Sequence, residues 1–316
     1  MRTYILLLIS TVLISGCTTP SPTAQLKELM QTYHEETLKM NPIGATYQGD
    51  TRYNDYLPNY LSDDVMRKHK TFYKDILQEL NSIADNSLGE EDQLSKEILK
   101  WECETNLMGM EFPRELLPID QMWTLQLTMG QLATGTGAQP FKTVKDYENW
   151  LSRVDDYVVW LSSAKTRMAE GIEQGVVLPK SLIRKVVPQL ASITEADLEK
   201  NIFYTPARNF PEDFTEAQKE KLSKAYADMV TNKIIPAYQR LMAFMASDYL
   251  AEGRNSSGFD AYSFGEDYYN YAVRLYTTTD MTADEIHQLG LSEVARLRSE
   301  MERIKKQVGF KGDLNA

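Results

Sequence analysis

Apolar residues recur three and four positions apart through most of this 316-residue chain, and this repeat constrains the fold more than any other feature. Positions with that spacing lie on one face of a helix, so each such stretch predicts an amphipathic helix. Alternating, strand-like patterns are scarce. The sequence therefore predicts a mainly α-helical protein, built as an array of many helices. The most regular stripe lies near the C-terminus, at Ile286, Leu289, Val294, Leu297, Met301, Ile304 and Val308.

The helix that carries this stripe has well-marked ends. Thr282 and Glu285 form a capping box, and Gly309 suits the left-handed position at which a helix stops. Burying each large residue of the stripe contributes roughly 1.5–3 kcal/mol before entropy is counted. We therefore expect the helix to need a substantial partner surface, part of which is missing from this chain.

Other stretches predict further helices by the same rule. Ser62 is a predicted N-cap, and Thr215 with Gln218 forms another capping box, at the start of a long helix that Pro236 should kink. Helical patterns also run from Val144 towards Gly175 and from Lys180 to Leu190. The core-facing residues predicted for the first four stripes are Leu26, Met30, Tyr33 and Leu38; Val65, His69, Phe72, Ile76, Leu80 and Ile83; Leu94, Ile98, Trp101 and Leu107; and Trp150, Val154, Tyr157, Leu161 and Met168.

Between two of these helices, Glu111 to Thr143 breaks the helical period. The segment contains three prolines and the run Thr134-Gly135-Thr136-Gly137. No strand precedes its Gly-x-Gly and no Lys-Ser/Thr follows, so the pattern indicates a plain loop and no phosphate site. Long irregular segments in compact domains tend to be functional or mobile.

The N-terminus resembles a bacterial lipoprotein signal. Arg2 precedes a mostly apolar run from Tyr4 to Ile14, and Ser15-Gly16 lead directly into Cys17. We expect residues 1–16 to be a signal peptide, Cys17 to be the lipid attachment site, and residues 17–23 to be a tether before a domain at 24–316. Thr18, by resemblance, favours the outer membrane facing the periplasm. An ordinary cleaved signal peptide is the competing interpretation.

Net charge and cysteine content limit the partners and the cross-links. A net charge of −11 argues against nucleic acid and against anionic membrane surfaces as partners, which leaves the lipid anchor as the expected link to the membrane. Cys103 is the only cysteine besides Cys17, so lipidation of Cys17 would leave no intramolecular disulfide. Cys103 lies on a helical pattern with no histidine near it in sequence, and we expect a buried, inert thiol.

We find no pattern for a metal site or a catalytic residue in the chain. A zincin helix needs two histidines four positions apart with a glutamate beside the first, but Leu38 stands where His34-Glu35 would need its second ligand. His69 fits a core position, and His287 fits the surface. The Gly-x-Ser-x-Gly and Ser-x-x-Lys patterns of serine enzymes are absent. We expect adjacent carboxylates such as Asp155-Asp156 to be solvated. A glycan-active enzyme would need two carboxylates that face the same cleft.

Aromatic residues crowd one short segment beside Arg274: Tyr262, Phe264, Tyr268, Tyr269, Tyr271 and Tyr276. Their spacing predicts that Tyr268, Tyr271 and Tyr276 pack inward, while Tyr269 points elsewhere. A phenol at a cleft can hold a substrate carbonyl or stack on a ring, which makes Tyr268, Tyr269 and Arg274 candidate residues of a substrate cleft. Packing in the core is the competing interpretation.

Five segments together resemble one bacterial family, DUF885, whose members look like zinc-dependent peptidases of the zincin type. The segments are Asn41–Asp50, Arg52–Asp55, Gly171–Lys180, Gly265–Tyr269 and Thr277–Gly290. Family members are similar over about twice this length, and their presumed zinc site, a His-Glu helix with a downstream His, belongs to the half that would follow Ala316. The resemblance thus implies the N-terminal part of a larger zincin-like helical metallopeptidase fold.

This resemblance implies zinc only in a complete family member. Alone, the chain is expected to bind no zinc and to cleave no peptide, and to contribute a scaffold and one wall of a peptide cleft. The alternative is a non-enzymatic envelope lipoprotein that binds a peptide or a partner protein through the aromatic segment.

Overall fold

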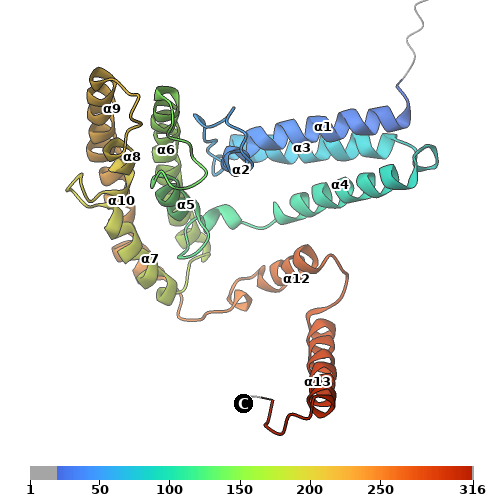
Figure 1. Cartoon of the computed structure of the whole chain (residues 1–316). Coiled ribbons are helices and arrows are strands. Elements are labelled where there is room, and N and C mark those ends of the chain that lie inside the picture. Colours follow the sequence, from blue (N-terminus) through green and yellow to red (C-terminus); the bar gives the residue numbers. More distant parts are fainter. Residues whose placement is uncertain (1–19, 315–316) are drawn as a thin grey trace, which may run out of the picture.

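A computed structural model describes residues 20–314, and the regular secondary structure in this part of the chain is helical (Figure 1). No strand forms among these residues; the single bridge joins Pro179 to Arg254. The mainly α-helical prediction is therefore confirmed. The signal peptide, Cys17 and the first part of the tether lie outside the described residues. Within them, no helix is both long enough and apolar enough to cross a membrane.

The N-terminal part of the body is a three-helix layer of α1 (Pro22–Met40), α3 (Asp63–Ser82) and α4 (Glu90–Gly109), with the short α2 (Pro42–Tyr47) after α1 (Figure 1). A 3₁₀ turn, η1 (Asp85–Ser87), joins α3 to α4. Ser62 caps α3 as predicted, through a bond from the amide of Val65. The core of this layer consists of Leu26, Leu29, Tyr73, Ile76, Leu80, Ile83, Leu88, Leu99 and Cys103.

The stripe predicted for α4 was wrong at two of its positions. Leu94 and Ile98 are 62% and 56% exposed, whereas Leu99 and Cys103 are buried. The α4 sequence carries apolar residues on two sides, and α1 and α3 cover only one of them. Periodicity alone could not show which side that would be.

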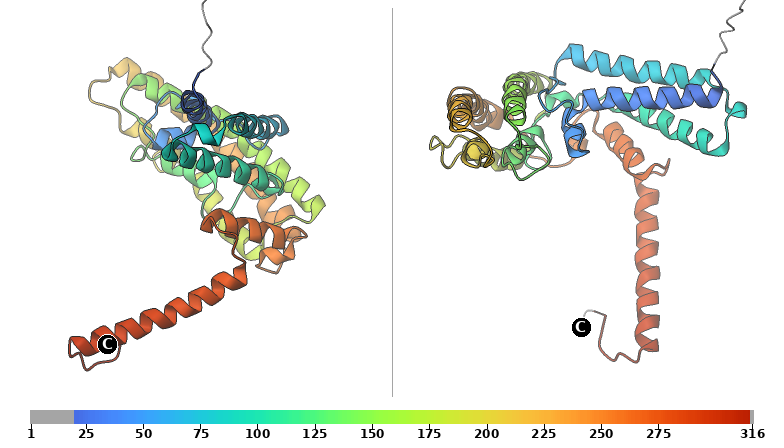
Figure 2. Two further views of the ribbon diagram at one scale, coloured as in Figure 1. Left: turned by 90° about the vertical axis from the view of Figure 1, so that its right-hand side faces the viewer. Right: turned by 45° about the horizontal axis from the view of Figure 1, so that its top comes forward.

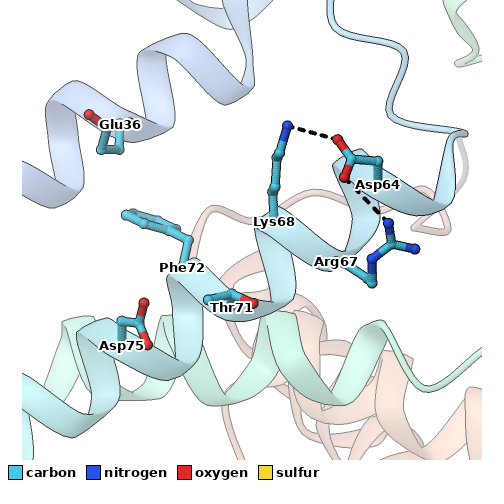
Figure 3. Close-up of a pocket in the computed structure, with 7 residues that line it drawn as sticks. All are labelled: Glu36, Asp64, Arg67, Lys68, Thr71, Phe72 and Asp75. Carbon is cyan, nitrogen blue, oxygen red and sulfur yellow. Dashed lines mark hydrogen bonds and ion pairs between the residues drawn. The ribbon is translucent and has the colours of Figure 1, made fainter.

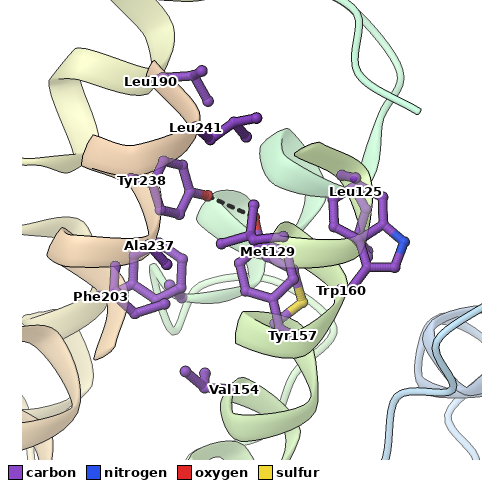
Figure 4. Close-up of a cluster of buried hydrophobic side chains, with 14 of the residues drawn as sticks. Leu125, Met129, Val154, Tyr157, Trp160, Leu190, Phe203, Ala237, Tyr238 and Leu241 are labelled. Atoms are coloured by element: carbon purple, nitrogen blue, oxygen red, sulfur yellow. Dashed lines mark hydrogen bonds between the residues drawn. The ribbon is translucent and has the colours of Figure 1, made fainter. Parts of the chain in front are cut away.

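The larger core surrounds α6 (Val144–Gln174), which runs through the second part of the body (Figure 1). All five α6 residues predicted to face the core are buried, and Gly175 ends the helix in the left-handed conformation. Residues of several further elements belong to this core or pack against it: α5 (Leu125–Leu132), α7 (Lys180–Ile193), η3 (Ile202–Tyr204), α8 (Thr205–Arg208), α9 (Glu216–Asp228), α10 (Ile235–Phe244) and α11 (Leu250–Glu252). In the middle of this core the hydroxyls of Tyr157 and Tyr238 lie 2.7 Å apart (Figure 4).

The helix predicted to be kinked at Pro236 has a more specific irregularity. A π-helical turn at Met229–Ile234 connects α9 to α10, and Pro236 lies in the first turn of α10. At that position the missing proline N–H costs little, because the wide turn has already displaced the hydrogen-bond ladder. A second π-helical turn, at Met245–Tyr249, connects α10 to α11. The chain thus stays helical without a break from Glu216 to Glu252.

The segment from Glu111 to Thr143 is more ordered than its composition indicated. It contains a 3₁₀ turn, η2 (Arg114–Leu116), and the eight-residue α5, which the sequence reading missed. The loop before α5 is held by Asp120, whose carboxylate accepts the amides of Met122 and Trp123. A helix this short gives barely two turns of apolar repeat, so its period is easily lost.

One buried arginine joins the two parts of the body. Arg153 of α6 is fully buried, and its guanidinium donates to the Thr46 hydroxyl at 3.0 Å, to the Gln139 side-chain oxygen at 2.8 Å and to the Tyr53 carbonyl at 2.6 Å. It also reaches the carbonyl of Pro42. Burial lowers the pKa of Arg153 to about 10, so the group remains charged at neutral pH. Arg153 therefore fixes the whole 42–53 segment onto α6.

The C-terminal helices leave the body. After η6 (Phe259–Ala261), α12 (Gly265–Thr277) returns to the end of α4, and α13 (Ala283–Gln307) then projects away (Figures 1 and 2). The capping box at Thr282 and the left-handed Gly309 are present as predicted. No residue of α13 is buried; Val294, in the middle of its stripe, is 65% exposed. Within the described residues, the stripe borders only the C-terminal tail, where Phe310 and Leu314 line one hollow with Met301, Ile304 and Val308.

We expect Arg153→Lys to destabilise the fold strongly. A lysine ammonium keeps the charge but cannot reproduce the planar set of donors, which leaves buried acceptors on the 42–53 segment unpaired. The free energy of unfolding should fall by about 2–4 kcal/mol, measured by urea denaturation. Arg240→Lys, at an exposed position on α10, is the matched control and should change stability by less than about 0.5 kcal/mol. Equal stabilities of the two variants would contradict the role given to Arg153.

Candidate functional site

The predicted aromatic segment docks α12 onto the body. Phe112, just after α4, has its ring centroid 5.3 Å from that of Tyr268, 5.4 Å from that of Tyr271 and 6.3 Å from that of Phe264. Tyr268 also contacts Phe259, at 4.8 Å between centroids. Aromatic pairs at such distances contribute beyond their buried area. Most of the cluster is thus packing between elements, which was the competing interpretation.

The contact between α12 and α4 depends on a glycine. Tyr271 is buried, and its hydroxyl approaches the last turn of α4 so closely that a Cβ on Gly109 would lie 2.3 Å from the Tyr271 Oη atom. Real Cβ atoms are not found at that separation, so either the phenol or the helix would have to move. Gly109 therefore sets how closely α12 can pack.

The three residues predicted for a substrate cleft do not converge. Tyr268 is partly buried in the aromatic cluster, whereas Tyr269 is 54% exposed, on another side of α12. Arg274 is exposed and pairs with Asp280, with 3.6 Å between Nη1 and Oδ1. Two hollows, one between α1 and α3 and one beside the end of α13, are lined by none of these three residues.

The expectation that Tyr276 packs inward was wrong, because its side chain is 85% exposed. Five residues of helix after Tyr271 rotate the side chain by about 140° from the buried face. Leu275 occupies the inner position instead and is partly buried. The predictions for Tyr271, buried, and Tyr269, pointing elsewhere, are consistent with the structure.

An open groove of about 520 Å³ lies between α1 and α3, and the sequence did not predict it (Figure 3). Its lining is mostly charged around one aromatic ring: Glu36, Asp64, Arg67, Lys68, Thr71, Phe72 and Asp75. The Phe72 ring stacks on Tyr33, with centroids 5.6 Å apart. The local signal was available in the first turns of α3, where acidic and basic residues stand three and four positions apart.

Charges of opposite sign are separated along this groove (Figure 3). At one end Lys68 Nζ lies 2.7 Å from Asp64, and Arg67 lies 3.3 Å from the same carboxylate, so two cations share one anion. The bond from Lys68 lowers the pKa of the Asp64 carboxyl. Asp75 lies on the far side of Phe72, so that end is acidic. The groove can therefore contact a ligand that carries both charge signs around an apolar group.

The described residues do not fit a zinc site. Within residues 20–314, no three His, Cys, Asp or Glu side chains come close enough together to hold a metal ion. Glu35, beside His34, is paired with Arg52. His69 is half-buried, and burial lowers its pKa below the usual value; His287 is exposed on α13. The three histidines lie on α1, α3 and α13, and we derive no catalytic step from them.

Two other candidate groups also have structural explanations. Cys103 is buried as predicted, and burial raises the pKa of its thiol to about 12, which makes it a poor nucleophile at neutral pH. Of the adjacent carboxylates on α6, Asp155 pairs with Lys233, whereas Asp156 accepts the amide of Leu57. Partial burial raises the pKa of Asp156. The two side chains therefore do not form a catalytic pair.

Comparison with known proteins settles the family. Residues 42–316 match the family described as "Bacterial protein of unknown function (DUF885)". The chain belongs to the DUF885 family. The crystal structure of a protein named the "putative lipoprotein from Colwellia psychrerythraea" matches with a TM-score of 0.77 and 19% sequence identity. At that identity the likeness establishes the fold alone.

That match covers 93% of this chain and 53% of the Colwellia chain. This DUF885 chain therefore spans about half the length of the solved relative. No match is found among functionally curated proteins. The family segments noted in the sequence now have structural roles: the 42–53 segment is the part bound by Arg153, and Gly265–Tyr269 begins the helix that docks on α4.

We expect Gly109→Ala to weaken the docking of α12. The added methyl group must displace Tyr271, and overpacking of this kind lowers the free energy of unfolding by about 1–3 kcal/mol. Adding Tyr271→Phe removes the clashing hydroxyl and should recover part of the loss, as a double-mutant cycle by urea denaturation would show. Gly290→Ala is the control, because its Cβ would meet nothing within 4 Å. Additive effects at positions 109 and 271 would contradict this account.

Proposed function

We propose that this DUF885 chain is a lipid-anchored protein of the cell envelope that forms the N-terminal, helical part of a zincin-like peptidase fold. Cys17 carries the acyl chains, and the residues between it and the start of α1 at Pro22 hold the body away from the outer membrane, on its periplasmic side. The observation that carries the proposal is the family match over residues 42–316, joined to a fold match with a protein named as a lipoprotein. The small residues before Cys17 agree with it.

In this proposal the helical body contributes a scaffold and one wall of a peptide cleft. The groove between α1 and α3 supports the second role. A peptide presents charged groups of both signs and apolar side chains, and the groove places acidic and basic side chains around Phe72. The scaffold role is supported by Arg153 and by the continuous core around α6, which hold the helices in fixed positions.

The zinc-binding side chains that the family resemblance implies are not supplied by residues 20–314. We therefore assign zinc only to a complete family member, and we assign this chain no catalytic residue. Its contribution is to bind and to position, and any hydrolysis would require ligands from elsewhere.

Purified chain should contain less than about 0.1 zinc per molecule after dialysis, because its histidines lie on separate helices and a zinc site takes three or four convergent ligands. Elemental analysis measures the metal content, and a fluorogenic peptide pool measures cleavage with and without a chelator. A preparation dialysed against zinc and then washed controls for metal loss. Stoichiometric zinc, or chelator-sensitive cleavage by this chain, would refute the assignment.

A second candidate function is that of a non-enzymatic lipoprotein which binds a peptide or a partner protein through the aromatic segment. The observation that favours it is the exposure of two phenols on α12, Tyr269 and Tyr276. Exposed tyrosines offer a large contact area at low cost in side-chain entropy, and aromatic residues dominate binding hot spots.

Titration against peptide pools separates the two binding sites. If the aromatic segment binds, Tyr269→Ala should raise the dissociation constant by about tenfold or more, the size of effect expected when a hot-spot tyrosine is truncated. Asp75→Asn, in the groove, should then leave it unchanged. The reverse pattern supports the groove as the peptide site. Both side chains are surface groups, so far-UV circular dichroism should show the fold of each variant intact.

A further inference from the structure

The first turn of α1 is fixed only a few residues after the proposed lipid attachment site. The helix begins at Pro22, and the hydroxyl of Ser21 caps it by accepting an amide of the first turn at 3.3 Å. The Gln25 side chain donates to the carbonyl of Pro20 at 2.9 Å. Hydrogen bonds therefore hold the chain from Pro20 onward, three residues after Cys17.

A second set of contacts joins this first turn to α4 and η1. The Thr23 hydroxyl donates to the carboxylate of Asp92 at 2.7 Å. The next residue, Gln93, donates through its side chain to the carbonyls of Asp85 and Leu88 at 2.9 and 3.0 Å. The start of α1, the start of α4 and η1 thus form one end of the body. We call residues 20–25 and 85–93 the link end.

The length of α1 separates the link end from the larger core. Its 19 residues rise by about 28 Å, at 1.5 Å per residue. At its far end the chain enters the 42–53 segment, which Arg153 fixes onto α6. In Figures 1 and 2 the link end and the helices α8 to α10 lie at opposite ends of the body.

We infer that the link end is the part of the body that faces the lipid surface, and that the core around α6 stands away from it. The inference rests on the proposed lipidation of Cys17 and goes beyond it. Whatever its path, the chain from Cys17 to Ser21 spans at most about 14 Å, because four residues extend by about 3.3–3.6 Å each. An acylated Cys17 lies at the membrane surface, so the link end stays within roughly that distance of the lipid headgroups.

The charge of the body opposes a flat orientation on the membrane. The first turn of α4 carries Glu90, Glu91 and Asp92, and η1 carries Asp85. The net charge of the sequence is −11, so anionic headgroups repel the body over a range of about 8 Å at physiological salt. A body attached at one end responds to this repulsion by pivoting about that end. The short link, and no attraction to lipid, therefore keeps the link end near the membrane.

This orientation places the groove between α1 and α3 away from the lipid. Glu36 follows Pro22 by 14 residues along α1, which is about 21 Å from the link end. Asp64 lies in the first turn of α3, whereas η1 follows the last turn of that helix. A soluble peptide can therefore reach the groove without displacing lipid.

Quenching by lipid headgroups tests the inference on the lipidated chain in vesicles. Asn86→Cys, on η1, and Glu212→Cys, between α8 and α9, place the same fluorophore at exposed positions at the two ends of the body. The vesicles contain phosphatidylethanolamine with a minority of phosphatidylglycerol, and some lipids carry a nitroxide on the headgroup. We expect quenching at position 86 to be about fivefold greater or more, because the short link limits only that end. Cys103 is buried, and burial raises the pKa of its thiol, so it should remain unlabelled.

A longer link is the matched control. An insertion of about ten Gly and Ser residues between Thr19 and Pro20 keeps the anchor, the cap of α1 and every charge. Such a segment adds roughly 17 Å of root-mean-square reach, so quenching at position 86 should fall by about half or more. Quenching that the insertion leaves unchanged would show that lipid attracts the link end, and it would overturn the inference.

Equal quenching at positions 86 and 212 would overturn it as well, because the body would then lie flat. Flotation with the vesicles tests the anchor separately. A chain that does not float refutes the proposed lipidation, and the orientation falls with it. A chain that floats but is quenched equally at both ends refutes the orientation alone.

Discussion

The guanidinium of Arg153 is the interaction on which the arrangement of the body depends. It is charged and fully buried, and it lies at the point where the N-terminal layer meets the larger core. A buried charge is costly unless it is hydrogen-bonded, and here both terminal nitrogens donate, to a hydroxyl, a side-chain amide oxygen and backbone carbonyls, while Nε has no partner. The 42–53 segment is held by these bonds, and α1 and α3 flank that segment in the chain. Further bonds to α6 hold the chain between that segment and α3: Asp156 accepts the amide of Leu57, and Arg167 donates to the carbonyl of Leu61 and pairs with Asp63. These contacts together place the groove between α1 and α3 relative to α6.

The aromatic cluster around Phe112 performs the corresponding task at the other end of the chain. It holds α12 against the end of α4, where Gly109 leaves room for Tyr271. From there α13 leaves the body with most of its apolar stripe exposed. The family match and the half-length overlap with the Colwellia structure are consistent with a body that binds and positions.

Local rules were reliable wherever a short stretch of chain decides the outcome. The capping residues Ser62, Thr215 and Thr282 are all hydrogen-bonded as predicted, because a cap involves only three or four consecutive residues. The α6 stripe was also correct, since α6 is long and its apolar residues lie on one side. The stripe predicted for α4 was wrong because α4 has apolar residues on two sides. The prediction for Tyr276 was wrong because it lies five residues after Tyr271, and that spacing does not place two side chains on the same face of a helix.

The sequence by itself determined the family, the helical class and the capped ends of several helices, because these depend on residue spacing and on local hydrogen bonds. It also identified an apolar stripe on α13. Only the tertiary structure decided which faces are covered, that Tyr268, Tyr269 and Arg274 do not share a cleft, and that α1 and α3 form a charged groove. The physical reason is that burial depends on contacts between residues far apart in the chain. Arg153 shows this most directly, since its partners at 42–53 lie about one hundred residues before it in the sequence.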